Sequence, residues 1–258
     1  MPERLGLWAY GVVRGDAPEL PARSGVDGRH DTELIRHAGL AAIVSGVGLD
    51  EFDRGVLEQR LEELDYLETL ARAHEQVLEE ALRLGPIVPL PICTIYEDAD
   101  HVCEMLERER SALAGALERL RGTAEWGVKA YVVQREAAPP AERAQGSSPG
   151  IEYLTRKRQE RQAALAASDE AAEAVERIHE ALCEHAVAAV VNRPQDQRLS
   201  GVDEEMVLNA AYLVPEAELA EFRAQIEDLA SRHASEGLAL SLTGPWPPYH
   251  FATSAAER

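Results

Sequence analysis

The stretch Trp126–Val133 (WGVKAYVV) is rich in aromatic and β-branched residues, which predicts a β-strand. Further elements are predicted after it by apolar periodicity and by turn residues. In chain order they are a helix from near Ile151, a strand over Val187–Val191, a strand over Met206–Val214, a helix from Pro215, and a strand from Leu238 to Leu242. The order strand, helix, strand, strand, helix, strand is that of the split βαβ, or ferredoxin-like, arrangement.

Upstream of this stretch, three apolar segments predict strands of a second sheet. Leu5–Val13 (LGLWAYGVV) and Leu40–Val47 have the composition of buried strands. Ile87–Tyr96 (IVPLPICTIY) is equally apolar, but Pro89 and Pro91 lack the amide protons that a central strand needs. We therefore expect an edge or bulged strand there.

Two helices are predicted between and after these strands. Over Val56–Leu84 apolar residues recur at steps of three and four, which indicates a long amphipathic helix ended by Gly85 and Pro86. A second helix is expected to begin at a cap supplied by Asp98 or Asp100 and to stop at Gly122. Its predicted apolar face consists of Val102, Leu106, Leu113, Leu117 and Leu120.

The predicted fold class is therefore α+β with two domains. The chain of 258 residues is long enough for two cores, because domains cluster near 100 to 150 residues. Residues 1–122 would form an N-terminal domain with a small sheet and two long helices. Residues 123–258 would form a ferredoxin-like C-terminal domain with an aromatic and proline-rich tail. The stretch Glu136–Gly150, rich in Ala, Pro, Ser and Gly, is expected to be a loop or linker.

The charge of the chain argues against two classes of partner. Its formal net charge of -20 would repel both phosphate backbones and anionic lipids, so we expect neither nucleic acid nor membrane binding. The three cysteines form no C-x-x-C pair, and the sequence shows neither a secretory signal nor a membrane-spanning run. A reduced, cytoplasmic location is expected.

A search for catalytic or metal-binding patterns yields no strong candidate. His179 and Cys183 have the spacing of two metal ligands on a helix, but buried packing explains the pair better because no second pair accompanies it. Gly46-Val47-Gly48 lacks the third glycine of a dinucleotide fingerprint, and no P-loop, nucleophile elbow, HExxH or calcium loop occurs. We expect no enzymatic activity, no metal and no cofactor.

One basic run interrupts the acidic sequence, and it has two interpretations. Arg156, Lys157, Arg158 and Arg161 could contact an acidic partner or an acidic helix of this chain. The alternative is a solvated helical face with intrahelical ion pairs.

The tail Ser241–Phe251 (SLTGPWPPYHF) resembles the C-terminus of the GvpF/GvpL family of gas vesicle proteins, which has the pattern L-T-G-P-W-P-P-Y-x-F. Further segments that are similar to the family, in the same order, are Leu7–Val12 (LWAYGV), Val88–Tyr96 (VPLPICTIY), Glu125–Tyr131 (EWGVKAY) and Asn209–Val214 (NAAYLV). Many GvpF-like members read approximately V-P-L-R-F-G-T-V-F where this chain has Pro91 and Cys93 in place of arginine and glycine. That departure favours the GvpL-like branch.

The resemblance implies a two-domain accessory protein of gas vesicle assembly, located in the cytoplasm and at the gas vesicle. Its implied partners are the major shell protein GvpA and other Gvp accessory proteins, and it implies neither catalysis nor a cofactor. The competing hypothesis is a small-molecule-sensing regulatory module, because ferredoxin-like domains also serve in that role.

The tail itself has two interpretations. Its candidate residues are Trp246, Pro247, Pro248, Tyr249 and Phe251. They could fasten the chain end as a buried clamp across a domain junction, or they could present an aromatic docking patch. Because prolines cannot donate ladder hydrogen bonds, the last strand is expected to end near Thr243 and to continue as an extended ribbon.

Overall fold

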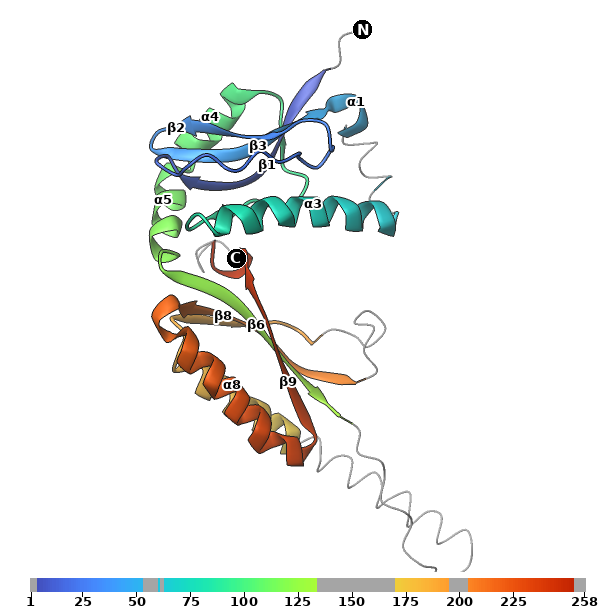
Figure 1. Cartoon of the computed structure of the whole chain (residues 1–258), viewed down its shortest axis with the longest axis vertical. Coiled ribbons are helices and arrows are strands. Elements are labelled where there is room, and N and C mark those ends of the chain that lie inside the picture. The colour runs from blue at the N-terminus through green and yellow to red at the C-terminus, as the bar shows by residue number, and fades with distance from the viewer. Residues whose placement is uncertain (1–3, 53–59, 61–62, 134–169, 195–203, 253–258) are drawn as a thin grey trace, which may run out of the picture. The chain divides into compact units, whose positions relative to one another are not determined.

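The computed structural model describes residues 4–52, 60, 63–133, 170–194 and 204–252 (Figure 1). The chain forms two compact units, an N-terminal unit of residues 1–125 with 245–258 and a C-terminal unit of residues 126–244. The sequence predicts that the tail belongs to a C-terminal domain of residues 123–258. In the structure, the residues from Pro245 onward belong to the N-terminal unit instead. Each unit contains one antiparallel sheet with helices, so the expected α+β class is confirmed.

The sheet of the N-terminal unit is built around β1 (Leu5–Arg14), in the order β2-β3-β1-β4. β1 pairs along its whole length with β3 (Leu40–Gly48), from Leu5 opposite Gly48 to Arg14 opposite Leu40. The strands predicted over Leu5–Val13 and Leu40–Val47 are therefore confirmed. β2 (Thr32–His37) was not predicted, because its residues TELIRH are as polar as an exposed helix or loop and it lies at the sheet edge.

The segment from Val88 to Tyr96 pairs with the other side of β1 as two short strands. β4 (Val88–Pro89) lies opposite Gly11 and Val12, and β5 (Ile95–Tyr96) lies opposite Leu7 and Trp8. Between them the chain bulges, which confirms the predicted bulged edge. Cys93 in this bulge has a φ of 67°, a left-handed conformation that glycine adopts more readily than other residues. The glycine of GvpF-like sequences at this position therefore has a conformational explanation.

Five helices belong to the N-terminal unit as far as the structure describes it, and the last of them, α9 (Tyr249–Ala252), lies in the tail. α1 (Leu49–Phe52) follows β3, and α3 (Leu64–Leu82) runs along one face of the sheet (Figure 1). The helix expected from Val56 is described only from residue 63 onward and at residue 60. The second expected helix is divided into α4 (Ala99–Arg108) and α5 (Arg110–Arg119).

The boundaries of α4 and α5 follow the signals seen in the sequence. The Asp98 side chain accepts a hydrogen bond from the His101 backbone N–H at 3.0 Å, so Asp98 supplies the cap. At the other end Gly122 has a φ of 68°, which terminates the helical segment. All five residues of the predicted apolar face are buried: Val102, Leu106, Leu113, Leu117 and Leu120.

A core of aromatic and aliphatic side chains joins α3 to the sheet of the N-terminal unit. Trp8 and Tyr10 of β1 are fully buried and pack with Val77 and Leu78 of α3. His74 lies among them with 1% of its surface exposed. The Trp8 Nε1–H donates to His74 Nδ1 at 3.0 Å, and the Tyr10 ring stacks on the imidazole with 5.2 Å between centroids. Burial lowers the pKa of His74 to about 4, so the imidazole is neutral at pH 7.

The C-terminal unit holds the second sheet, in the order β7-β8-β6-β9. The strands are β6 (Thr123–Val132), β7 (Ala188–Val191), β8 (Glu205–Pro215) and β9 (Leu238–Trp246). Residues 170–183 are helical and precede β7. A 3-10 turn over Glu216–Glu218 leads from β8 into α8 (Leu219–His233), and a second turn over Ala234–Glu236 leads to β9. Strands expected over Val187–Val191 and Met206–Val214 are confirmed.

α8 covers this sheet through an apolar face. Phe222, Ile226 and Leu229 are buried, and the Phe222 ring lies 5.6 Å from that of Tyr212 on β8. The Arg223 guanidinium lies 4.9 Å from the Trp126 ring of β6. Within the described residues of the whole chain, no helix combines the length and the apolar character needed to span a bilayer.

Candidate functional site

The tail continues as a strand beyond the expected end near Thr243. β9 runs through Gly244 and Pro245 to Trp246, so the prediction of its end was wrong. The reason is the position of β9 at the edge of the sheet, where a proline nitrogen facing away from the partner strand breaks no ladder hydrogen bond.

After β9 the chain turns into α9 (Tyr249–Ala252), and the expected extended ribbon was also wrong. The carbonyl of Pro248 accepts hydrogen bonds from the backbone N–H groups of Phe251 at 3.1 Å and Ala252 at 2.9 Å. The carbonyl of Pro247 accepts from Tyr249 at 2.8 Å. Prolines are well tolerated at the start of a helix, where an amide proton has no intrahelical acceptor.

The candidate residues of the tail divide into buried and exposed groups. Pro247, Pro248 and Phe251 are buried, with 8% of Phe251 exposed. Trp246 and Tyr249 are exposed, with exposed fractions of 41% and 39%. The full burial of Trp246 that the clamp interpretation required is not found. The buried residues can fasten the tail, whereas Trp246 and Tyr249 are only partly covered.

A buried carboxylate fixes the tail within the N-terminal unit. Glu125 is 3% exposed, and its Oε2 accepts a hydrogen bond from the His250 backbone N–H at 3.2 Å. Its Oε1 lies 2.6 Å from His250 Nδ1. A carboxylate removed from water is costly unless it is paired and hydrogen-bonded, so this contact favours the docked tail over a detached one.

A second carboxylate binds the tail from α3. The Tyr249 hydroxyl hydrogen-bonds to Glu75. Burial, and the negative charge of Glu75, raise the pKa of Tyr249. Burial raises the pKa of Glu75 as well, and this effect outweighs the opposing hydrogen bond from Tyr249. The tyrosine is thereby held as a neutral hydrogen-bond donor to the carboxylate.

Sequence reasoning did not identify the three polar partners in these contacts. Glu75, Glu125 and His250 look like ordinary members of a chain with 46 acidic residues and 8 histidines. The resemblance to the family could have identified two of them, because Glu125 and His250 lie inside segments that resemble the family. The basic candidates Arg156, Lys157, Arg158 and Arg161 lie outside the described residues.

The pair with metal-ligand spacing lies against a buried tyrosine. Cys183 Sγ is 3.7 Å from His179 Nε2, and His179 Nδ1 is 2.7 Å from the Tyr212 hydroxyl. Burial raises the pKa of the Cys183 thiol and that of Tyr212, which disfavours their anionic forms. Over the described parts of the chain, no three His, Cys, Asp or Glu side chains come together as a metal centre would require.

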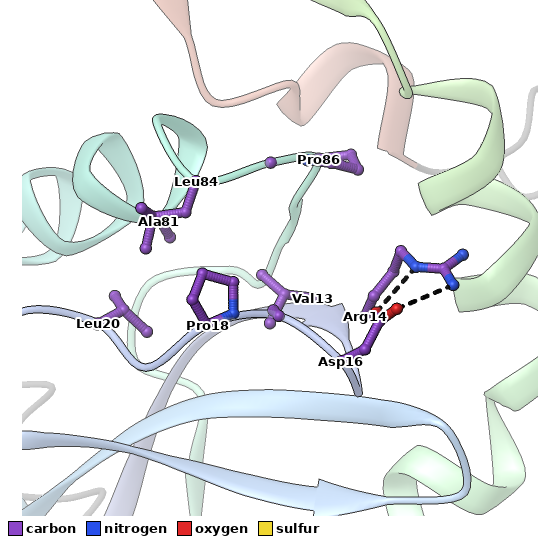
Figure 2. A pocket seen from close by; sticks show the side chains of 10 residues that line it. Val13, Arg14, Asp16, Pro18, Leu20, Ala81, Leu84 and Pro86 are labelled. Atoms are coloured by element: carbon purple, nitrogen blue, oxygen red, sulfur yellow. Dashed lines mark hydrogen bonds and ion pairs between the residues drawn. The ribbon is translucent and has the colours of Figure 1, made fainter.

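Figure 2 shows a small hollow between the end of α3 and the segment after β1. Its volume is about 210 Å³, below the 300 to 1,000 Å³ of typical ligand sites. Pro18, Leu20 and Leu84 form apolar walls, and an exposed ion pair of Arg14 with Asp16 lies at one side, at 3.1 Å. Asp16 raises the pKa of Arg14, and Arg14 lowers that of Asp16.

A larger groove of about 540 Å³ lies between the 88–96 segment and the α4–α5 pair. Its floor is apolar and includes Val88, Met105 and Leu113. Arg108 and Arg119 line it, and Ala252 of α9 lies at it as well. We call it the α4–α5 groove. The residues that line it include no constellation of catalytic groups.

Comparison with known proteins places the whole chain in one family. Residues 6–253 match the family described as "Gas vesicle synthesis protein GvpL/GvpF". The chain is 38% identical to gas vesicle protein L of Streptomyces sp. (strain CB03234), over 97% of this chain and 94% of that protein. It is 29% identical to gas vesicle protein F of the same strain, over 96% of this chain and 99% of that protein.

The fold agrees with solved structures of the family. The crystal structure of the gas vesicle protein GvpF from Anabaena sp. PCC7120 superposes with a TM-score of 0.66 at 18% identity, covering 97% of each chain. GvpF from Microcystis aeruginosa gives a TM-score of 0.64 at 18% identity, covering 96% of this chain and 99% of that one. The higher identity to gas vesicle protein L agrees with the GvpL-like departure at Pro91 and Cys93. The chain therefore belongs to the GvpL/GvpF family of gas vesicle proteins.

Proposed function

We propose that this protein is an accessory factor of gas vesicle assembly that acts without catalysing a reaction. The family match over residues 6–253 carries this proposal. The chemistry of the described residues supports it, since the polar contacts of the tail are structural and the groove has apolar walls without a nucleophile and base in contact.

The proposed activity is binding of the shell protein GvpA and other Gvp proteins while the shell forms. A shell that excludes water needs small apolar subunits, which expose hydrophobic faces and strand edges before they assemble. A chain with a net charge of -20 stays soluble while it covers such surfaces. In this function the protein works in the cytoplasm and at the growing gas vesicle.

A gene deletion in a strain that retains the rest of its gas vesicle cluster tests the proposal. We expect few or misshapen vesicles by electron microscopy and normal growth, with wild-type vesicles restored by a plasmid copy. Pull-down of co-expressed shell protein tests the binding step separately. Normal vesicles in the deletion strain would rule out the function. A metabolite that raises the melting temperature strongly would instead favour the small-molecule-sensing alternative.

We further propose that the C-terminal unit is a ferredoxin-like, split βαβ domain, and that the two units act as domains. The strand order β7-β8-β6-β9 supports this, because it places the first and third strands of the unit at the centre. The helical residues 170–183 and α8 occupy the two positions between strands where that arrangement has helices. Hydrogen exchange on the full chain tests the division, since separate domains should show two distinct protection levels.

A further inference from the structure

We propose that the α4–α5 groove docks a short amphipathic helix of a partner protein, one that carries acidic side chains beside an apolar face. The groove belongs entirely to the N-terminal unit. Its volume of about 540 Å³ is within the range of sites that bind ligands and peptide side chains.

The backbone beside the groove favours a partner that binds as a helix over one that binds as an added strand. The 88–96 segment is the sheet edge on this side of β1, and an exposed sheet edge ordinarily invites an added strand. Pro89 and Pro91 have no amide proton, and the chain bulges before β5, so a continuous ladder cannot form there. A partner must therefore bind through side chains, as an amphipathic helix does in an apolar groove.

The chain already docks a helical turn of its own beside this groove. α9 packs against β4 and α5, and its residues Phe251 and Ala252 are 8% and 7% exposed. Ala252 lines the groove itself, so the groove continues the surface that receives α9. Beyond Ala252, the floor formed by Val88, Met105 and Leu113 extends the same apolar surface.

The arginine side chains at the groove favour an acidic partner, although the chain as a whole is acidic. Arg108 and Arg119 line the groove and are exposed. Glu109, which also lines the groove, neutralises Arg108 through an ion pair of 2.9 Å, with both side chains largely in solvent. Arg119 has no ion pair within the described residues, which leaves a local positive charge on a protein of net charge -20. A carboxylate on the docked helix would complement it.

A second copy of this chain is a poor occupant, because two molecules of net charge -20 repel each other. The groove itself does not depend on the proposed function. Only the identification of the partner as another gas vesicle protein rests on that function.

Two synthetic peptides test the groove on the full chain by fluorescence anisotropy. Each is a labelled amphipathic helix of about 12 residues, or three turns, with a Leu and Ala face. One has Glu beside that face and the other has Lys at the same positions. The overall charge of the protein favours the Lys peptide, whereas the groove favours the Glu peptide. We expect the Glu peptide to bind more tightly, and tighter binding of the Lys peptide, or binding of neither, would overturn the proposal.

Substitutions locate the binding. The double variant Arg108→Glu/Arg119→Glu should weaken the Glu peptide by about tenfold or more, as expected for the loss of complementary charge at a partly desolvated site. Ala112→Trp, which fills the groove from an exposed position on α5, should block both peptides. Arg110→Glu is the control for a charge reversal outside the groove, because Arg110 is an exposed residue of α5 that does not line the groove. Equal losses in the control and the double variant would overturn the proposal.

The failure of this inference can be separated from failure of the proposed function. The peptide measurements stand whether or not the deletion strain makes vesicles. If the deletion abolishes vesicles, complementation with the double variant should give the deletion phenotype, and with Arg110→Glu the wild-type phenotype. Sedimentation of the purified chain checks for self-association, and a dimer dissociated by Ala112→Trp would mean that a second copy is the occupant.

Discussion

Glu125 holds His250 through both of its carboxylate oxygens, one at 2.6 Å from Nδ1 and the other at 3.2 Å from the backbone nitrogen. The two residues are 125 positions apart, so the contact fixes the C-terminal tail on the N-terminal unit. Because Glu125 is 3% exposed, removing the imidazole leaves one oxygen of a buried carboxylate without its partner, while the backbone N–H still binds the other oxygen. We expect His250→Ala to lower the free energy of unfolding by about 2 to 3 kcal/mol, measured by denaturant titration.

The exposed pair of Asp98 with His101 provides the control. Its Oδ1 to Nδ1 distance is 2.8 Å, but its side chains are 55% and 50% exposed. His101→Ala keeps the backbone N–H that Asp98 caps and should cost less than about 1 kcal/mol. Equal effects of the two substitutions would show that burial does not determine the strength of the tail contact.

Alanine substitutions of Trp246 and Phe251, the first and the last aromatic residue of the tail, should lower the free energy of unfolding by different amounts. Phe251→Ala removes a ring that is 8% exposed and should cost about 3 kcal/mol or more. Trp246 is 41% exposed, so Trp246→Ala should cost about 1 kcal/mol. Denaturant midpoints of the two variants, together with shell-protein pull-down, separate fastening from docking. A cost for Trp246→Ala as large as that for Phe251→Ala would restore the clamp interpretation of the tryptophan.

Much of the fold could be predicted because local signals and burial coincide. Asp98 caps α4, Gly122 ends the helical segment, and Pro89 marks an edge strand, each through a property of the single residue. The sequence did not predict β2 or the end of β9, because whether these residues form a strand depends on their position in the sheet. A polar edge strand is stabilised by its neighbour β3, and Pro245 is tolerated only because β9 lies at an edge.

The candidate site was predictable only in part, for the same reason. Pro247, Pro248 and Phe251 stand out in the sequence by type and by resemblance to the family. Glu125 becomes distinctive only when burial separates it from the many solvated carboxylates, and the sequence carries no measure of that. The α4–α5 groove arises from packing among segments far apart in the chain, and no periodicity indicates it.

The hairpin between β2 and β3 has a strained backbone at Ala38, which a substitution can relieve. Ala38 and Gly39 form its two-residue loop with φ angles of 52° and 81°, the combination of a type I′ turn. Alanine is disfavoured at positive φ, whereas asparagine and glycine are suited to it. Ala38→Asn should therefore raise the free energy of unfolding by about 0.5 to 1 kcal/mol.

Gly39→Ala, at the next residue of the same turn, should have the opposite effect on stability. A Cβ at Gly39 would meet no neighbouring atom, so its effect reports on the backbone conformation alone. It should destabilise the protein by about 1 kcal/mol. Thermal melts of both variants check the pair, and a shift of the same sign in both would contradict the turn assignment.

His74 should make the protein sensitive to mild acid. Its pKa is lowered by burial from 6.5 to about 4, so the unfolded chain binds the proton more readily than the folded one. The stability that depends on the neutral imidazole is complete above pH 6.5, falls as the pH decreases toward 4, and changes no further below that value. Protonation would also place a proton on Nδ1, the atom that accepts from Trp8. From pH 7.5 to 5 we expect this histidine to account for a loss of about 2 kcal/mol.

Other groups titrate over the same range, so the comparison must isolate His74. In His74→Gln the side-chain oxygen can still accept from the Trp8 indole, but the residue cannot take up a proton. This variant should be less stable than the wild type at pH 7.5, because glutamine replaces a ring stacked on Tyr10. Its stability should then decline less steeply, so that the difference between the two proteins narrows by about 2 kcal/mol at pH 5. Parallel curves for the two proteins in urea titrations across this range would show that the folded protein accommodates a charged His74.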